Sequence, residues 1–173
     1  MNNALRVALI ASLAVVAVAG CTKKVKEAPP ETPPADNGAT TGGIVDNTPG
    51  RYTPADLDSD PCLRTRVIYF DFDQDLLRPE FQQTINCHAK YLRDRPEARM
   101  SLEGNADERG TREYNLGLGE RRGNAVQSAL SAAGGSSSQL NVVSYGEERP
   151  VCRQHDESCW SKNRRVEIIY TAK

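Results

Sequence analysis

The chain has 173 residues, a formal net charge of −1, five cysteines and a mean hydropathy of −0.58. This length suits one domain with appendages, the hydropathy excludes a polytopic membrane protein, and the charge argues against a general nucleic-acid binder, which needs a basic surface. Seven of the ten prolines lie between positions 29 and 61, and the longest apolar run lies before position 20. The folding unit is therefore expected to be much shorter than the chain.

Residues 1–20 are predicted to be a secretory signal peptide. Arg6 is the only charge before position 23, and residues 7–18 are almost entirely apolar. A membrane span needs about 20 apolar residues, so a cleaved signal is favoured over the alternative, a short transmembrane anchor.

The end of this run indicates a lipid anchor at Cys21. Val18-Ala19-Gly20-Cys21 resembles the bacterial lipobox, in which the cysteine is lipidated and becomes the mature N-terminus. Such a cysteine is expected to carry three acyl chains, and two or more chains anchor stably. By resemblance to bacterial sorting rules, Thr22 in place of aspartate favours the outer membrane, with the domain facing the periplasm.

Residues 21–61 are predicted to be the lipidated cysteine plus a disordered tether. The stretch is rich in proline, threonine, glycine and aspartate, and almost nothing in it is apolar enough to bury. Residues 62–173 are then the folded domain, with 112 residues and room for one core.

Strands and helices alternate along this domain. Short β-branched or alternating runs predict strands at 67–70, 99–103, 140–145 and 165–170. Apolar residues at helical spacing predict helices from Arg78-Pro79 to Arg95-Pro96 and from about Tyr114 to Ala133. This order predicts an α/β fold, a two-layer sandwich of a mixed sheet of about four strands with helices on one face. Periodicity does not give the strand order.

Arg122 lies on the apolar face of the second helix. Leu118, Val126 and Leu130 form the predicted core stripe, and Arg122 falls between them. A guanidinium there needs a partner, because a buried charge without one is costly. One interpretation is an internal ion pair with Asp107. The other is that Asp107 and Arg122 stay partly open and bind the ammonium and carboxylate of a zwitterionic ligand.

The four cysteines after Cys21 lie in or at the edge of the domain. Cys152, His155 and Cys159 could form a metal loop, but they supply three ligands where a closed zinc site usually needs four. In an oxidising compartment a Cys152–Cys159 disulfide is favoured, and it would stiffen an irregular connection of about 18 residues. Cys62 and Cys87 are predicted to pair, with one or both remaining free as the alternative.

No catalytic motif stands out in the sequence. There is no nucleophile elbow, phosphate loop or metal-pair pattern, and His88 lies on a helical stripe, where a core role is favoured. Asp71, Asp73 and Asp75 lack the glycine and distal glutamate of the known calcium loop. We therefore expect neither enzymatic activity nor a metal or other cofactor. A cell-wall hydrolase is the least favoured hypothesis.

Six segments of the domain match the motifs of one known family. They are Tyr69-Phe70-Asp71-Phe72-Asp73, Glu103-Gly104-Asn105-Ala106-Asp107-Glu108-Arg109-Gly110-Thr111, Glu113-Tyr114-Asn115, Leu118-Gly119-Glu120-Arg121-Arg122, Val143-Ser144-Tyr145-Gly146 and Ser161-Lys162-Asn163-Arg164-Arg165. Together they resemble the outer-membrane-protein-A-like domain family, in its peptidoglycan-associated lipoprotein branch. The lipobox and the proline-rich tether point to the same branch. The resemblance offers no support for the disulfides, since typical members lack these cysteines.

The resemblance implies non-covalent binding of peptidoglycan through the diaminopimelate of its stem peptide. Asp107 and Arg122 would hold the ammonium and carboxylate, and Phe72, Asp73 and Leu118 would line the same pocket. It also implies periplasmic Tol-system proteins as partners, with roles in envelope integrity and in outer-membrane constriction at cell division. The alternative is an envelope interaction protein, with an internal Asp107–Arg122 pair and a protein partner instead of peptidoglycan.

This sequence departs from the family pattern in two places. Asn105-Ala106 replaces the more usual His or Thr residues before the aspartate. Gly117, Gly119 and Gly123 are expected to weaken the second helix, by about 0.5–1 kcal/mol each relative to alanine.

Overall fold

The structure is a computed structural model that describes residues 50–173. The predicted signal peptide, the lipidation site Cys21 and the tether up to residue 49 lie outside the described residues. Within residues 50–173, no helix is both long and apolar enough to cross a membrane.

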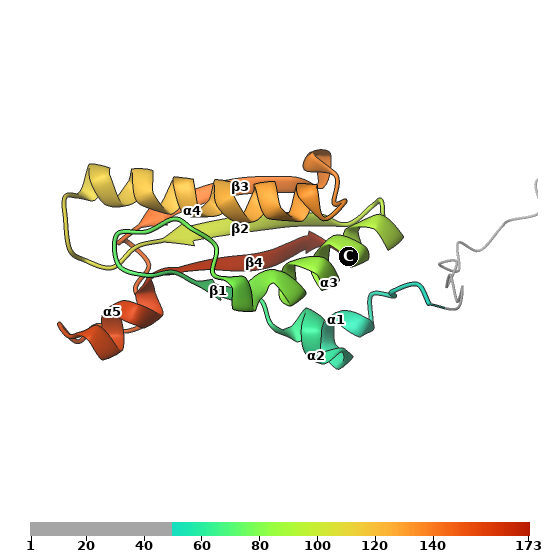
Figure 1. Ribbon diagram of the computed structural model, residues 1–173, viewed down its shortest axis with the longest axis horizontal. Coiled ribbons are helices and arrows are strands. Elements are labelled where there is room, and N and C mark those ends of the chain that lie inside the picture. The colour runs from blue at the N-terminus through green and yellow to red at the C-terminus, as the bar shows by residue number, and fades with distance from the viewer. Residues whose placement is uncertain (1–49) are drawn as a thin grey trace, which may run out of the picture. The chain divides into compact units, whose positions relative to one another are not determined.

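A four-stranded mixed sheet forms one layer, and helices form the other (Figure 1). The strands are β1 (Val67–Tyr69), β2 (Arg99–Asn105), β3 (Leu140–Gly146) and β4 (Arg165–Ala172), in the order β1-β4-β2-β3. β2 and β3 are parallel, and β4 runs antiparallel to both of its neighbours. Helices α3 (Gln82–Asp94) and α4 (Arg112–Ala132) cover the same face. The predicted two-layer α/β architecture is confirmed.

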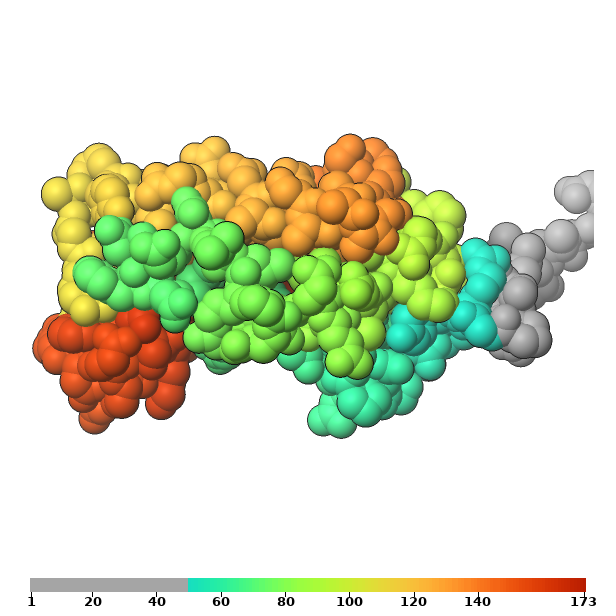
Figure 2. All heavy atoms as spheres, in the orientation of Figure 1, coloured from blue at the N-terminus to red at the C-terminus, as the bar shows by residue number. Residues whose placement is uncertain are grey.

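The core lies between the sheet and these two helices, which cover it in the space-filling view (Figure 2). Each helix contributes the stripe that its spacing predicts, with Ile85 and Leu92 from α3 and Val126 and Leu130 from α4 fully or almost fully buried. Alternate residues of the central strands complete it: Met100, Leu102, Val166 and Ile168. The residues at helical spacing in α3 and α4 and the alternate residues of β2 and β4 therefore form one common core.

The folded unit begins before the predicted boundary at residue 62. Two short helices, α1 (Asp56–Ser59) and α2 (Pro61–Arg64), precede β1, and Leu57 is fully buried in the core. Asp60 caps α2 by accepting hydrogen bonds from the backbone N–H groups of Cys62 (2.8 Å) and Leu63 (3.1 Å). The predicted boundary is therefore too late, because helices of four residues leave no periodic signal.

Besides α1 and α2, one more helix is absent from the sequence prediction. The connection between β3 and β4 contains α5 (Glu157–Asn163), whose N-cap Asp156 accepts a hydrogen bond from the Cys159 N–H at 3.1 Å. The predicted irregular loop is thus partly helical. Single 3₁₀ turns, η1 (Pro79–Phe81) and η2 (Ser137–Gln139), precede α3 and β3.

Glycines bring α4 unusually close to the sheet. A Cβ on Gly119 would lie 2.4 Å from Ser144 Oγ and 2.9 Å from the Gly104 carbonyl oxygen, and one on Gly123 would lie 2.5 Å from a Val142 methyl group. Two of the three glycines that the sequence marks as weakening the helix, Gly119 and Gly123, therefore permit its close approach.

Candidate functional site

Arg122 is fully buried at the carboxyl end of β2, and its partners are backbone carbonyls. Nε donates to the carbonyl of Gln74 (2.8 Å), Nη1 to that of Asn105 (2.9 Å) and Nη2 to that of Asp71 (3.1 Å). The internal ion pair with Asp107, one of the two interpretations from the sequence, is therefore wrong. Burial, and second the charge of Arg164, lower the pKa of Arg122 to about 10, so it remains a cation at neutral pH.

Two other arginines neutralise Asp107, whose exposed fraction is 4%. Arg109 contributes Nε at 3.1 Å and Nη2 at 2.7 Å, and Arg164 contributes Nη1 at 3.3 Å. Burial alone would raise the pKa of Asp107, but the hydrogen bonds from both arginines and the charge of Arg109 outweigh it and hold that pKa below its ordinary value. The carboxylate is thus ionised and held in a fixed orientation.

Arg164 joins this site to α5 and to the end of β1. Its Nε donates to the Phe70 carbonyl (3.1 Å), and its Nη2 donates to Glu157 Oε1 (2.5 Å). Its side chain is 7% exposed. Because Arg164 is buried and each of its nitrogens has an acceptor, its guanidinium is held in one position beside Asp107.

A pocket of about 220 Å³ opens beside these groups. It is lined by Phe72, Asp73, Asp107, Arg109, Gly110, Tyr114, Asn115, Leu118 and Arg122. All five residues that the resemblance nominates are therefore brought together by the loop after β1, the loop after β2 and the first turns of α4. Asp73 has a positive φ of 58° and accepts a hydrogen bond from the Tyr114 hydroxyl.

The sequence did not single out Arg109 or Arg164 as site residues. Both occur within the family motifs, Asp107-Glu108-Arg109 and Asn163-Arg164-Arg165. Their role becomes visible only when the loop after β2 and the start of β4 meet at one carboxylate. Tyr114, Asn115 and Gly110 likewise line the pocket because of the turn that leads into α4.

Both arginine and aspartate side chains line this one cavity. Three of the five N–H groups of Arg122 donate to carbonyls, and one N–H on each of Nη1 and Nη2 has no acceptor among residues 50–173. Two such donors match the two oxygens of a carboxylate. Asp73 and Asp107 supply carboxylates in the same pocket, that of Asp107 already bonded by Arg109 and Arg164. The arrangement suits a small zwitterionic group.

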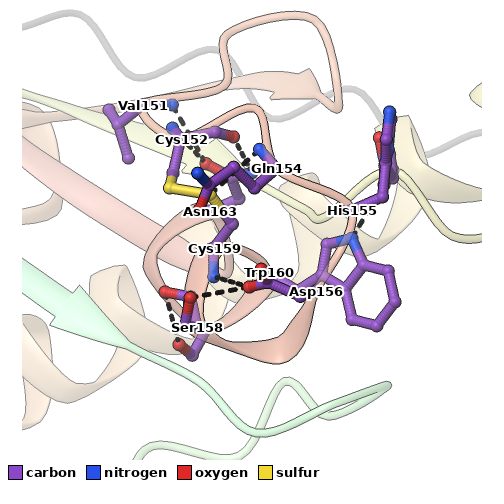
Figure 3. The surroundings of a disulfide bond; sticks show 11 residues. Val151, Cys152, Gln154, His155, Asp156, Ser158, Cys159, Trp160 and Asn163 are labelled. Carbon is purple, nitrogen blue, oxygen red and sulfur yellow. Dashed lines mark hydrogen bonds and ion pairs between the residues drawn. A yellow bond between two sulfur atoms is a disulfide. The ribbon is translucent and has the colours of Figure 1, made fainter.

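Both predicted disulfides are present. Cys62–Cys87 joins α2 to α3, and Cys152–Cys159 closes the loop that leads into α5 (Figure 3). The thiols of the alternative metal loop are therefore used in a disulfide. No cluster of three or more His, Cys, Asp or Glu side chains suited to a metal occurs within the described part of the chain.

Comparisons with known proteins agree on one family. The family model described as "OmpA family" matches residues 69–164. The peptidoglycan-associated lipoprotein of Haemophilus influenzae is 40% identical over 98% of this chain and all of that protein. The protein of the same name from Pseudomonas putida is 43% identical over 91% of this chain and 92% of its own length.

Solved structures give the same result. The crystal structure of the peptidoglycan-associated lipoprotein from Burkholderia pseudomallei is 43% identical, with a TM-score of 0.64 over 65% of this chain and 96% of that one. The C-terminal domain of Helicobacter pylori MotB shares the fold, with a TM-score of 0.56 over 61% of this chain and 83% of that one, at 22% identity. The chain therefore belongs to the OmpA family and, within it, to the group of peptidoglycan-associated lipoproteins.

Proposed function

We propose that this protein is an outer-membrane lipoprotein whose domain faces the periplasm and binds peptidoglycan non-covalently. Cys21 would carry the lipid anchor, and the tether would let the domain reach the cell wall. Relatives that match over nearly the whole chain are named for their association with peptidoglycan, which supports this proposal. The protein acts as a binding module without enzymatic activity, and it joins the outer membrane to the wall.

The recognised group is the free end of diaminopimelate in the stem peptide. The observation that carries this assignment is the pair of Arg122 N–H groups left without a described acceptor in a pocket that also contains Asp107. The ligand carboxylate binds Arg122, and its ammonium binds Asp107. Phe72, Asp73 and Leu118 form the walls around the methylene chain.

The resemblance extends the proposal to protein partners. Periplasmic proteins of the Tol system would bind this domain, and the exchange between them and peptidoglycan would support envelope integrity and outer-membrane constriction during division. Cross-linking in intact cells, followed by identification of the adducts, tests this part separately from wall binding. Adducts that contain no Tol protein would contradict it.

Co-sedimentation of the full-length protein, in detergent, with purified sacculi tests the wall-binding proposal. We expect Asp107→Ala and Arg122→Ala to weaken binding at least about 30-fold, because losing one charged contact in a buried site costs roughly 2–5 kcal/mol. Arg121→Ala and Asp58→Ala are matched controls: Arg121 neighbours Arg122 but its side chain is 49% exposed, and Asp58 lies far along the chain on α1 with its side chain 74% exposed. Site variants that remain folded and sediment like the wild type would contradict the assignment.

A further inference from the structure

The Asp107 carboxylate already has a donor for each of its acceptor positions. Its Oδ1 accepts from the Arg109 backbone N–H (3.1 Å) and Arg109 Nε (3.1 Å). Its Oδ2 accepts from Arg109 Nη2 (2.7 Å) and Arg164 Nη1 (3.3 Å). A carboxylate offers about four lone-pair positions. A ligand ammonium can therefore bond Asp107 only if one of these donors leaves.

The side chain of Arg109 is the donor that is free to leave. Arg164 is buried and also held by the Phe70 carbonyl and Glu157, and the Arg109 backbone N–H is fixed by the turn after β2. The Arg109 side chain is 31% exposed and lines the pocket. Glu157 Oε2 lies only 3.6 Å from its Nη2, so a second carboxylate can receive the guanidinium when it moves.

Two aromatic rings hold Arg109 in place. Its Cζ lies 3.9 Å from the centroid of Phe72 and 4.1 Å from that of Trp160, so the guanidinium is sandwiched between the loop after β1 and α5. Cation–π contacts at this distance are attractive. A ligand cation that displaces Arg109 must compensate for the loss of these contacts.

The Cys152–Cys159 loop keeps Trp160 in this position (Figure 3). Trp160 Nε1 donates to Glu108 Oε1 at 2.8 Å, and the same oxygen lies 2.5 Å from His155 Nδ1. The disulfide and the Asp156 cap fix the start of α5. Trp160 is also the only tryptophan of the chain, so tryptophan fluorescence reports on the surroundings of this one side chain.

We propose that Arg109 determines specificity as an internal competitor: it occupies Asp107, and a ligand must present a free ammonium to displace it towards Glu157. This inference rests on the proposed function of the same pocket. Its consequence is discrimination, because a diaminopimelate whose side-chain amine is acylated has no charge with which to replace Arg109. The strength of the stacking on Phe72 and Trp160 determines how strongly the pocket prefers a ligand with a free ammonium over one with an acylated amine.

Calorimetric titration of the full-length protein with a synthetic stem peptide ending in diaminopimelate tests the competition. We expect Arg109→Gln to bind this peptide at least threefold more tightly than the wild type, because Asp107 is then available. Arg109→Lys, which keeps a charge but loses the planar fork, should lie between them. Arg112→Gln is the matched control, since Arg112 lies three residues away, is 65% exposed and pairs with Glu148. Weaker or unchanged binding by a folded Arg109→Gln protein would overturn the proposal.

Two further arms separate this proposal from the function on which it rests. The stem peptide should change Trp160 emission in the wild type but not in Arg109→Gln. The peptide acetylated on its side-chain amine should bind the wild type at least tenfold more weakly and should leave the emission unchanged. Binding without any emission change in the wild type would overturn the competition and leave the pocket assignment intact. No binding by any variant would overturn the proposed function itself.

Discussion

The two disulfides lie near opposite ends of β4, in surroundings of different character. Cys62–Cys87 joins two helices beside His88, which is fully buried and contacts the Tyr170 hydroxyl at 2.7 Å. Cys152–Cys159 closes a short loop beside Glu157 and Trp160, which both contact the pocket residue Arg109. The first cross-link reinforces a closed core. The second holds one wall of the candidate binding site.

Similar cross-links therefore serve separate purposes within one small domain. A chain-entropy estimate gives about 3.5 kcal/mol for a loop of 25 residues and about 2 kcal/mol for one of 7, so stability alone does not distinguish them strongly. Ligand binding should distinguish them, because only the second contacts residues around Arg109.

The largest effect is expected from removing the Cys62–Cys87 bond. The double substitution Cys62→Ser with Cys87→Ser should lower the free energy of unfolding by about 3.5 kcal/mol. Urea denaturation measures this loss. Affinity for the diaminopimelate peptide should be unchanged under conditions where the variant is folded. Weakened binding by the folded variant would show that the Cys62–Cys87 bond also influences the pocket.

The next effect is an acid sensitivity that originates at His88. Burial, partly opposed by the contact with the Thr65 carbonyl, lowers the pKa of His88 to about 4, against about 6.5 in an unfolded chain. Between these values the unfolded chain binds a proton that the folded domain does not. Stability is therefore full above pH 6.5 and falls by about 3 kcal/mol as the pH drops to 4.

The variant His88→Gln should remove most of this dependence. Urea midpoints at pH 7 and pH 4 for both proteins measure it, and the comparison within each protein cancels the cost of the substitution itself. Carboxylates with lowered pKa values, such as Asp107, also destabilise the domain in acid, but they do so equally in both proteins. An identical pH dependence in the variant would rule out His88 as the source.

Removal of the Cys152–Cys159 bond should cost less stability but alter the site. The double substitution Cys152→Ser with Cys159→Ser is expected to lower the free energy of unfolding by about 2 kcal/mol. Because α5 then holds Trp160 less firmly against Arg109, affinity for the stem peptide should rise about threefold. Calorimetry and Trp160 emission report both changes. An affinity equal to that of the wild type would show that this loop does not influence the pocket.

Effects on stability alone, of comparable or smaller size, are expected from two glycines of α4. Gly119→Ala should destabilise the domain by about 1–3 kcal/mol, because its Cβ would meet Ser144 and the Gly104 backbone. Gly117→Ala should instead stabilise it by about 0.5–1 kcal/mol, since its Cβ would meet only Arg121 Nη1 at 3.4 Å. Thermal unfolding of the pair compares them. Equal shifts would mean that Gly119 is not a packing contact.

Hydrophobic periodicity was enough to predict the sheet and both long helices, since Met100, Leu102, Val126 and Leu130 follow simple strand or helix spacing. It could not predict α1, α2 or α5, because helices of four to seven residues are defined by caps and packing. Gly119 shows the same limit: helix propensity marks it as weak, whereas its contact with Gly104 comes from a strand 15 positions away in the sequence.

Within the site, the sequence placed Asp107 and Arg122 in one pocket but not their partners. Two of the three partners of Arg122 are carbonyls of a loop about 50 residues earlier and the third is the carbonyl of Asn105, and carbonyl positions leave no trace in residue types. The Arg109–Trp160 contact likewise spans 51 positions of the chain. Such contacts depend on how loops meet at the end of a sheet.

The binding of a ligand carboxylate by Arg122 is tested most directly with two stem peptides that differ by one carboxylate. Diaminopimelate and lysine both present a side-chain ammonium, but only diaminopimelate adds a carboxylate for Arg122. Calorimetric titration of the full-length protein should give at least tenfold tighter binding of the diaminopimelate peptide, equivalent to about 1.4 kcal/mol or more. This preference should disappear in Arg122→Ala and persist in Arg121→Ala. Equal affinities of the wild type for the two peptides would contradict the proposed role of Arg122.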